Sequence, residues 1–208
     1  YNNIVDIEAA WTLVQEFEQP AACIIKHTNP CGTALGENLV EAYQRALAAD
    51  PVSAFGGIIG LNRQVDKETA EKIAETFMEA VVAPGFAPDA LEVLKKKQNL
   101  RLLEIEPVQE QSEYWLEKVS GGFLVQDLDK KTVNLEELQV VTEKKPTAAE
   151  LEELLFAWKV VKHVKSNAIV VTKDRQTIGV GAGQMNRVGA ANIAFKQAGE
   201  KVQGAVLA

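Results

Sequence analysis

Histidine is scarce in this sequence, and one of the two histidines stands in an unusual setting. His27 follows an apolar run, residues 21–26, that is typical of a buried strand, and open α/β sheets place ligands at the carboxyl ends of strands. Lys26 adjoins it, and a nearby cation favours the neutral imidazole, which can act as a general base. Adjacent strand residues point to opposite faces, so the pair can share a site only if the strand ends between them. The alternative is a hydrogen-bonded loop histidine. His163 is interpreted as a partly exposed helix residue.

Zinc chemistry is not supported by the residues around this histidine. A zinc deaminase pairs His-x-Glu with Pro-Cys-x-x-Cys. Here Asn29 stands where the glutamate is needed, and Pro30-Cys31 lacks a second cysteine at the required spacing. Because a catalytic zinc needs three protein ligands, we expect no metal. The two cysteines, Cys23 and Cys31, make no disulfide scaffold, which fits a cytosolic origin.

A glycine-rich stretch, Gly179-Val-Gly181-Ala-Gly183-Gln184, follows an expected strand and precedes an expected helix. Its spacing differs from the dinucleotide-binding fingerprint, and no acidic residue ends a second strand about 20 residues later. The backbone amides of such a loop can still bind an anion, and Arg187 offers a guanidinium for phosphate. The alternative is a tight turn beside a surface arginine. Asn167, at the end of an expected helix, is either a helix stop or a ligand-binding residue.

Composition restricts the classes of partner. The 208 residues carry a net charge of −7, and the longest basic run, Lys95-Lys96-Lys97, is expected at a helix C-terminus. A nucleic-acid partner is therefore not expected, although a small anionic ligand is compatible with a local positive pocket. No apolar run reaches the roughly 20 residues that span a bilayer, and there is no signal-peptide pattern, so no membrane partner is expected.

Capped helices alternate with short apolar strands along the chain. Helices are expected after N-caps at Asp6, Asn38, Asp66 and Thr147. Strands are expected at residues 21–26, 56–61, 81–83, 100–105, 122–126, 168–173 and 177–180. This alternation predicts a mainly parallel sheet covered on both faces, with residues 27–36 as a loop and a polar connection at residues 127–146.

Several separated motifs together resemble one enzyme family. They are Lys26-His-Thr-Asn-Pro-Cys-Gly32, Asp50-Pro-Val-Ser-Ala-Phe-Gly-Gly57, Val82-Ala-Pro-Gly85, Ser166-Asn-Ala-Ile169 and Gly181-Ala-Gly-Gln-Met-Asn-Arg187. Over its whole length the chain is similar to the bifunctional purine-biosynthesis enzymes. In that family, aminoimidazole-carboxamide ribonucleotide (AICAR) formyltransferase is joined to inosine monophosphate (IMP) cyclohydrolase.

The resemblance implies an α/β fold of cytidine-deaminase-like α/β/α layered units without zinc, two in tandem with the second incomplete. The expected boundaries are residues 1–130 for the first unit, 131–146 for a connection and 147–208 for the start of the second. The chain begins without methionine and stops in an apolar stretch, so we expect a fragment of a longer protein. Because the cyclohydrolase domain and part of the folate pocket would lie outside it, we expect little or no transferase activity from this chain alone.

The resemblance also implies a reaction. A formyl group passes from the cosubstrate 10-formyltetrahydrofolate to the 5-amino group of AICAR, giving the formylated nucleotide that the cyclohydrolase domain closes to IMP. His27 matches the family's base, Lys26 matches its transition-state stabiliser, and Val188 matches a main-chain contact to folate. Positions that match contacts to AICAR are Asn3, Phe55, Gly56, Glu79, Asn167 and Arg187. A cytoplasmic homodimer that needs no metal is implied. The alternative function is a non-catalytic nucleotide-binding module.

Overall fold

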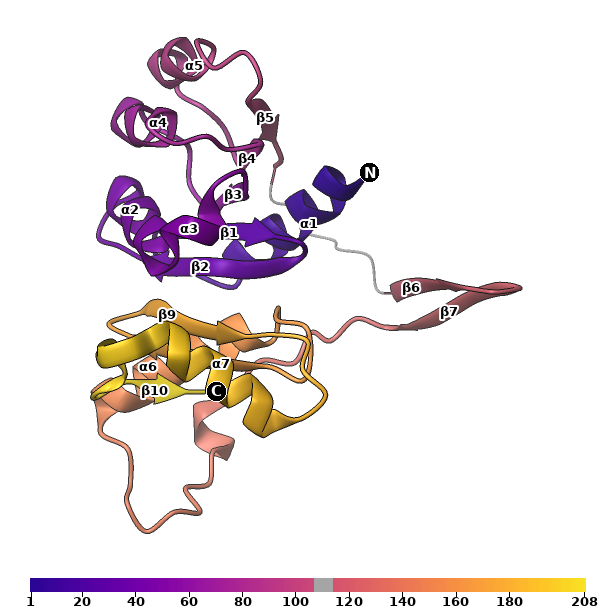
Figure 1. The fold of residues 1–208 in the computed structure, drawn as a ribbon, viewed down its shortest axis with the longest axis vertical. Helices are drawn as coiled ribbons and strands as arrows, with labels where there is room; N and C mark the ends of the chain where they lie inside the picture. Colours follow the sequence, from indigo (N-terminus) through magenta and orange to yellow (C-terminus); the bar gives the residue numbers. More distant parts are fainter. Residues whose placement is uncertain (107–113) are drawn as a thin grey trace. The chain divides into compact units, whose positions relative to one another are not determined.

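The computed structural model describes residues 1–106 and 114–208. They form two compact units, which we call unit 1 (residues 1–105 and 146–208) and unit 2 (residues 106–145). The strands of unit 1 are β1 (Ala21–Lys26), β2 (Asn29–Leu35), β3 (Ile58–Leu61), β4 (Ala80–Ala83), β5 (Arg101–Glu104), β8 (Ile169–Lys173), β9 (Gln176–Gly181) and β10 (Val206–Leu207). They form one eight-stranded sheet in the order β10-β8-β9-β2-β1-β3-β4-β5 (Figure 1).

The sheet of unit 1 is mixed, and the prediction of a mainly parallel sheet is wrong. β3–β4 and β4–β5 are parallel, while the other five pairings within this sheet are antiparallel. Two hairpins cause the difference, because the predicted loop at residues 27–36 is largely strand β2. Each hairpin turns through two residues with left-handed backbone angles, His27 and Thr28 (φ 54° and 64°) and Asp174 and Arg175 (φ 54° and 55°).

Seven α-helices of unit 1 have the bounds α1 (Asn2–Val14), α2 (Leu39–Ala49), α3 (Pro51–Ala54), α4 (Lys67–Ala74), α5 (Pro88–Leu94), α6 (Ala148–Val161) and α7 (Arg187–Ala198), and the 3₁₀ helix η2 covers Gly199–Val202. The predicted caps Asn38, Asp66 and Thr147 are confirmed, since each side chain accepts a backbone N–H of the first helical turn. The predicted cap Asp6 is wrong, because α1 already begins at Asn2. Phe77 lies beyond the end of α4, and its side chain is exposed.

Helices cover both faces of the sheet, in keeping with the α/β class predicted from the sequence. Along β1, Ala22 and Ile24 pack in a core cluster with α2, α4 and α5, while Cys23 and Ile25 pack in a second cluster with α1 and α6. This alternation follows from the two-residue period of a strand. A smaller cluster joins α7 to β8 and β9. The central strands are therefore buried on both sides and read as continuous apolar runs in the sequence.

Glycines in the strands let helix backbones come unusually close to the sheet. A Cβ built on Gly179 would lie 2.0 Å from the carbonyl oxygen of Ala194, and one on Gly181 would lie 1.9 Å from that of Ala190. Both alanines belong to α7. Gly32 of β2 and Gly60 of β3 meet helices α2 and α1 in the same way. Any side chain at these positions would push a helix away from the sheet.

The ends of α1 and α6 are joined by a cluster of charged groups around Glu16. Its Oε1 accepts from Lys162 Nζ at 2.9 Å and lies 3.0 Å from His163 Nε2. Lys159 Nζ donates to the backbone carbonyl of Glu16 at 2.6 Å and lies over the Phe17 ring. Burial alone would raise the pKa of Glu16, but the bonds from His163 and Lys162 outweigh it and lower the pKa to about 2. His163, just beyond the end of α6, thus has a structural partner.

Unit 2 contains a hairpin of β6 (Tyr114–Val119) and β7 (Gly122–Asp127), followed by the 3₁₀ helix η1 (Leu135–Glu137). The strand predicted at residues 122–126 is confirmed, while β6 was not predicted. One face of the hairpin carries Tyr114, Leu116, Phe123 and Val125, and the other carries Trp115, Val119 and Leu124. All seven side chains are exposed within the described residues.

The predicted domain boundaries at residues 130, 131, 146 and 147 stay a prediction. Residues 107–113, within the first predicted domain, lie outside the described residues. Strands from both predicted domains share the sheet of unit 1, where Ala34 of β2 pairs with Gln176 of β9. The hydroxyl of Thr177 accepts the Thr33 N–H at 2.9 Å beside this pair.

Replacing Gly179 by alanine is expected to destabilise unit 1. The new methyl group would collide with the backbone of α7, so we expect a loss of about 1–3 kcal/mol or more in the free energy of unfolding. Urea unfolding of wild type and variant measures it. Gly122→Ala is the matched control, because nothing lies within 4 Å of its added Cβ, and its expected effect is below about 0.5 kcal/mol. Equal effects of the two changes would contradict the packing argument.

Removing the Glu16 charge is expected to make stability less dependent on acid pH. The pKa of Glu16 in the folded state is about 2, which lies below its usual value of 4.5. The contribution of the charged group to the free energy of unfolding is therefore complete at pH values above 4.5 and is lost as the pH falls through about 2. Glu16→Gln should therefore cost about 1.5–3 kcal/mol at neutral pH, and this cost should shrink at about pH 3. Urea unfolding at both pH values measures it. Glu18→Gln, at an exposed carboxylate, is the control; a pH-independent loss in the Glu16 variant would contradict the assignment.

Candidate functional site

Lys26 and His27 lie where a central strand turns back on itself. β1 ends at Lys26 and residues 27–28 form the connection to β2, which we call the His27 turn. The strand therefore ends between the two candidates, as the sequence argument requires. Lys26 is half-buried, and its Nζ donates to the carbonyl oxygen of Phe55 at 2.7 Å, whereas the His27 side chain is exposed. An ammonium group has three N–H donors, so Lys26 can still donate to a ligand.

Two side chains from outside the His27 turn hold its backbone. Asp6 of α1 accepts the N–H of Thr28 through Oδ1 at 2.6 Å. Asn29 donates from Nδ2 to the His27 carbonyl oxygen at 3.0 Å, and its Oδ1 accepts the N–H of Lys165, also at 3.0 Å. The turn is thereby tied to α1 on one side and to the segment after α6 on the other.

Three of the candidate nucleotide contacts, Phe55, Gly56 and Glu79, belong to one group of linked residues, and Phe55 joins this group to Lys26. The rings of Phe55 and Phe77 have centroids 5.3 Å apart, and the N–H of Gly56 donates to the Phe77 carbonyl at 2.9 Å. Gly56 has a φ of 69°, which glycine adopts without strain. Glu79 precedes β4 by one position and pairs with Arg101 at 2.7 Å. We call Phe55, Gly56, Phe77 and Glu79 the Phe55 group. Because the Phe55 carbonyl accepts from Lys26, which precedes the His27 turn, this group is connected to the turn.

Asn167 lies beside the loop that precedes α7. Its N–H donates to the Gln184 carbonyl at 3.0 Å, and the N–H of Gln184 donates back to the Asn167 carbonyl at 3.1 Å. Next to this pair, the N–H of Gly183 donates to the carbonyl of Lys165 at 2.6 Å. Since the Lys165 N–H is bound by Asn29, these two segments are connected to the His27 turn.

The remaining candidates lie at helix starts. Asn3 stands one turn before Asp6 on α1 and therefore faces the same side of the helix. Arg187 and Val188 form the exposed first turn of α7, which Asn186 caps by accepting the Gly189 N–H at 2.7 Å. Among the described residues, no hydrogen bond or ion pair joins the Arg187 side chain to the His27 turn.

The glycine-rich stretch is explained mainly by packing. Gly179 and Gly181 are the two positions where α7 rests on β9, and this close approach accounts for their lack of a side chain. Gly183 differs, because it has a φ of 66° and nothing lies within 4 Å of a Cβ placed there. Of the three glycines, this one alone has open space beside its Cα, although its N–H is already bound to the Lys165 carbonyl.

The cysteines near the site are not suited to nucleophilic chemistry. Burial raises the pKa of Cys31 to about 12, and its Sγ donates to the Ile24 carbonyl at 3.3 Å. Burial also raises the pKa of Cys23. The reactive thiolate is therefore scarce at neutral pH. Within residues 1–106 and 114–208, no group of three or more His, Cys, Asp and Glu side chains is placed to hold a metal ion.

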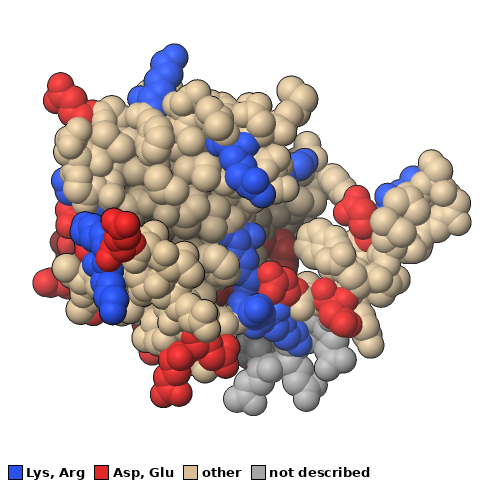
Figure 2. Space-filling model, turned by 90° about the horizontal axis from the view of Figure 1, so that it is seen from below, with Lys and Arg blue, Asp and Glu red and all other residues tan. Residues whose placement is uncertain are grey.

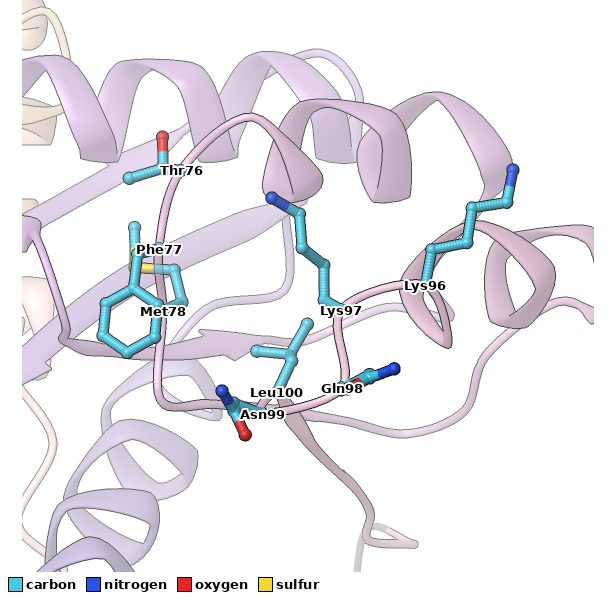
Figure 3. Close-up of a pocket in the computed structure, with 8 residues that line it drawn as sticks. All are labelled: Thr76, Phe77, Met78, Lys96, Lys97, Gln98, Asn99 and Leu100. Atoms are coloured by element: carbon cyan, nitrogen blue, oxygen red, sulfur yellow. The ribbon is translucent and has the colours of Figure 1, made fainter.

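Two surface hollows lie outside the His27 turn. One, of about 330 Å³, is lined by Thr76, Phe77, Met78, Lys96, Lys97, Gln98, Asn99 and Leu100 (Figure 3). The other, of about 360 Å³, is lined by Gln19, Pro20, Leu35, Gly36, Glu37, Glu41, Arg45 and Arg175. Through Phe77 the first hollow borders the Phe55 group, but the side chains of Lys96 and Lys97 diverge in Figure 3 and do not converge on one point.

Charge is distributed without one dominant basic area on the face that Figure 2 shows, where basic and acidic side chains are interspersed. None of the helices in the described part of the chain is both long and apolar enough to span a bilayer.

Sequence reasoning did not identify Asp6 or Lys165 as residues that support the site, and it noted Asn29 only because it stands where a zinc deaminase has glutamate. Asp6 was read as a helix cap, and its bond to Thr28 joins residues 22 positions apart. The bond between Asn29 and Lys165 spans 136 positions. Only two residues separate the predicted strand at residues 21–26 from Asn29, a spacing that is typical of a two-residue hairpin. Because this turn contains no glycine, the spacing also indicates that other residues must stabilise it.

Comparisons with known proteins identify relatives of the whole chain. The chain is 58% identical to the bifunctional purine biosynthesis protein PurH of Cyanothece sp. (strain PCC 7425) and 56% identical to that of Oceanobacillus iheyensis. Each match covers 100% of this chain and 41% of the relative, so the chain spans less than half the length of these relatives. Among solved structures, a dCMP deaminase from cyanophage S-TIM5 covers 50% of this chain and 96% of its own at 10% identity, but its TM-score of 0.39 is too low to establish a shared fold.

The model of one protein family, described as the AICARFT/IMPCHase bienzyme, matches residues 1–197. This match includes the His27 turn, the Phe55 group and the loop before α7. The chain belongs to the AICARFT/IMPCHase bienzyme family.

Proposed function

We propose that this chain supplies the catalytic pair of an AICAR formyltransferase that acts in purine (IMP) biosynthesis. The formyl group comes from 10-formyltetrahydrofolate, which is a cosubstrate, and passes to the 5-amino group of AICAR. In the parent protein, a cyclohydrolase domain closes the product to IMP. Support comes from family membership and from the PurH relatives, whose names state a bifunctional role in purine biosynthesis.

The proposed chemistry divides between His27 and Lys26. The amine of AICAR is a weak nucleophile because its lone pair is delocalised, so His27 takes its proton as nitrogen attacks the formyl carbon. The Lys26 ammonium stabilises the negative charge that forms on the formyl oxygen. The tetrahedral adduct then breaks its bond to folate N10, which takes a proton from the imidazolium. No metal is required by this sequence of steps.

The nucleotide and the folate are proposed to bind around this pair. The AICAR contacts are proposed to be Asn3, Phe55, Gly56, Glu79, Asn167 and Arg187. Val188 is proposed to contact folate through its main chain. Glu79 already pairs with Arg101, so in this scheme it holds the edge of the Phe55 group and meets the nucleotide with its free lone pairs.

One observation carries the proposal. Segments far apart in the sequence meet at the His27 turn: α1 through Asp6, the Phe55 group through Lys26, and the segment after α6 through Asn29. An isolated loop histidine needs no such convergence. The alternative of a non-catalytic nucleotide-binding module, which uses Gly181 to Arg187 and Asn167, gives no role to this convergence.

The proposal also covers the arrangement of domains and the cellular location. We infer two tandem cytidine-deaminase-like α/β/α units, the second beginning near residue 147, and a cytoplasmic location. The two hairpins β1–β2 and β8–β9, each with a left-handed two-residue turn, support a repeated architecture. The substrates are small molecules, and neither nucleic acid nor a membrane is a proposed partner.

The exposed hairpin of unit 2 supports a homodimer. A two-stranded hairpin is at best marginally stable alone in water, and this one carries large apolar side chains on both faces. Trp115 is 54% exposed and Phe123 is 67% exposed. Exposed apolar surface of this kind marks an interaction site. We propose that a second copy of the protein covers the hairpin.

Replacing His27 by alanine in the full-length enzyme is expected to abolish most formyl transfer. Loss of a general base typically lowers kcat by about 10²–10⁴-fold, while AICAR affinity should change little. Steady-state kinetics and calorimetric titration with AICAR measure the two effects. His163→Ala is the matched control, since that histidine pairs with Glu16 and should leave kcat nearly unchanged. Intact formyl transfer in the His27 variant with AICAR still bound would refute the catalytic assignment.

Charging the hairpin is expected to weaken dimerisation of the full-length protein. Leu116 and Val125 are directly paired on one face, so Leu116→Lys with Val125→Lys should raise the dimer dissociation constant at least about 10-fold by placing charge in an apolar contact. Sedimentation equilibrium measures it. Gln126→Lys on the same hairpin is the control, because it adds charge without removing an apolar side chain. A dimer unaffected by the double change would show that the hairpin lies outside the interface.

A further inference from the structure

The His27 turn adopts a conformation that its own residues disfavour. Both central residues have left-handed backbone angles, with φ of 54° at His27 and 64° at Thr28. Two-residue hairpin turns of this hand favour Asn-Gly, and a β-branched residue such as threonine is a clear outlier there. Lys26 and Asn29 pair across the turn, so only His27 and Thr28 connect the two strands. A longer connection with less strained backbone angles is therefore not available. Contacts from outside must therefore hold the turn.

Asp6 supplies the first such contact. Its Oδ1 accepts the N–H of Thr28 at 2.6 Å, within the range of charge-assisted bonds. Asp6 is the fifth residue of α1 and does not cap that helix, whose N-cap is Tyr1. The helix itself is fixed against the sheet, because Ala10 packs directly on Gly60. A carboxylate on a fixed helix thus holds the less favourable of the two turn residues.

Asn29 supplies the second contact, from the opposite side of the turn. Its amide donates to the His27 carbonyl oxygen, which also accepts the hydroxyl of Thr28 at 2.6 Å. Its oxygen binds the N–H of Lys165. One side chain therefore fixes the carbonyl of the proposed base and the segment that leads to Asn167. Rotation of the His27 backbone would break the bonds at its own carbonyl oxygen and the bond at the N–H of Thr28.

We propose that Asp6 and Asn29 are positioning residues that hold the His27 imidazole in its working orientation. This inference rests on the proposed function, in which His27 is the base. Both residues act through the backbone of the turn, and neither needs to touch the substrate. Small misplacements of a catalytic group are costly, since about 1 Å can lower a rate about 100-fold.

The test uses steady-state kinetics of the full-length enzyme. Asp6→Ala should lower kcat for formyl transfer about 10- to 100-fold with the KM for AICAR within about 3-fold. Asp6→Asn, which keeps an acceptor oxygen, should retain most of the activity. Glu8→Ala is the matched control, because it removes an exposed carboxylate from the same helix. Equal losses in the Asp6→Ala and Glu8→Ala variants would overturn the role of Asp6.

A second substitution separates positioning from a general structural role. Glycine adopts left-handed angles without strain, so Thr28→Gly should recover much of the kcat lost in Asp6→Ala. A helix merely weakened by losing Asp6 would gain nothing from a change in the turn. Absence of recovery, with both proteins folded by circular dichroism, would contradict the proposal for Asp6.

Asn29 is tested separately with two changes. Asn29→Ala should lower kcat as Asp6→Ala does. Asn29→Asp keeps the oxygen that binds Lys165 but loses the donor to His27, so it should show the same loss if the His27 contact is the important one. Wild-type kcat in Asn29→Asp would overturn the claim that Asn29 orients His27.

The failure of this inference is distinguishable from the failure of the proposed function. In a His27→Ala background, Asp6→Ala should cause no further loss of kcat, because the group it positions is gone. If His27→Ala alone leaves kcat unchanged, the proposed function fails. If His27→Ala is inactive while Asp6→Ala and Asn29→Ala retain wild-type kcat, the base assignment stands and the positioning inference is refuted.

Discussion

The close approach of helix backbones to strand glycines is the constraint on which unit 1 depends. Alanines of α1 and α7 rest on Gly60, Gly179 and Gly181, at distances that exclude any Cβ on the strand. This contact fixes the depth of each helix above the sheet. It also fixes the depth of Asp6, four residues before the alanine that rests on Gly60, and of the α7 N-terminus where Arg187 begins. The polar groups of the candidate site are thus positioned by apolar packing beneath them.

Three of the four helix caps predicted from local residue patterns are confirmed, whereas the pairing of the strands did not follow from such patterns. The caps at Asn38, Asp66 and Thr147 depend on bonds within three residues, so type and spacing suffice to predict them. Strand β2 was missed because Asn, Pro and Gly are common in loops, although Gly32 is required there by the nearby helix. The sheet direction was wrong because an alternation of helices and strands does not reveal which neighbouring strands form hairpins.

The candidate residues could be chosen from the sequence, but the bonds that hold their backbone could not. The end of an apolar run marked Lys26 and His27, and family motifs marked the segments around Asn167 and Arg187. Nothing in residue spacing indicates that Asp6 reaches Thr28, or that Asn29 reaches Lys165, because those bonds depend on how the helices cross the finished sheet. Residues that orient a reacting group are, for this reason, harder to find than the reacting group itself.

The pairing of β2 with β9 has a consequence for the order in which the chain folds. It joins positions more than 140 residues apart through Ala34 and Gln176, with the Thr33 and Thr177 bonds beside them. Contacts of such long sequence separation carry the largest loop-closure entropy and form late. The bond from Asn29 to Lys165 spans a similar separation. We therefore expect the orientation of His27, the proposed base, to be completed among the last steps of assembly, so partly folded chains hold the histidine without the geometry that the proposed role requires.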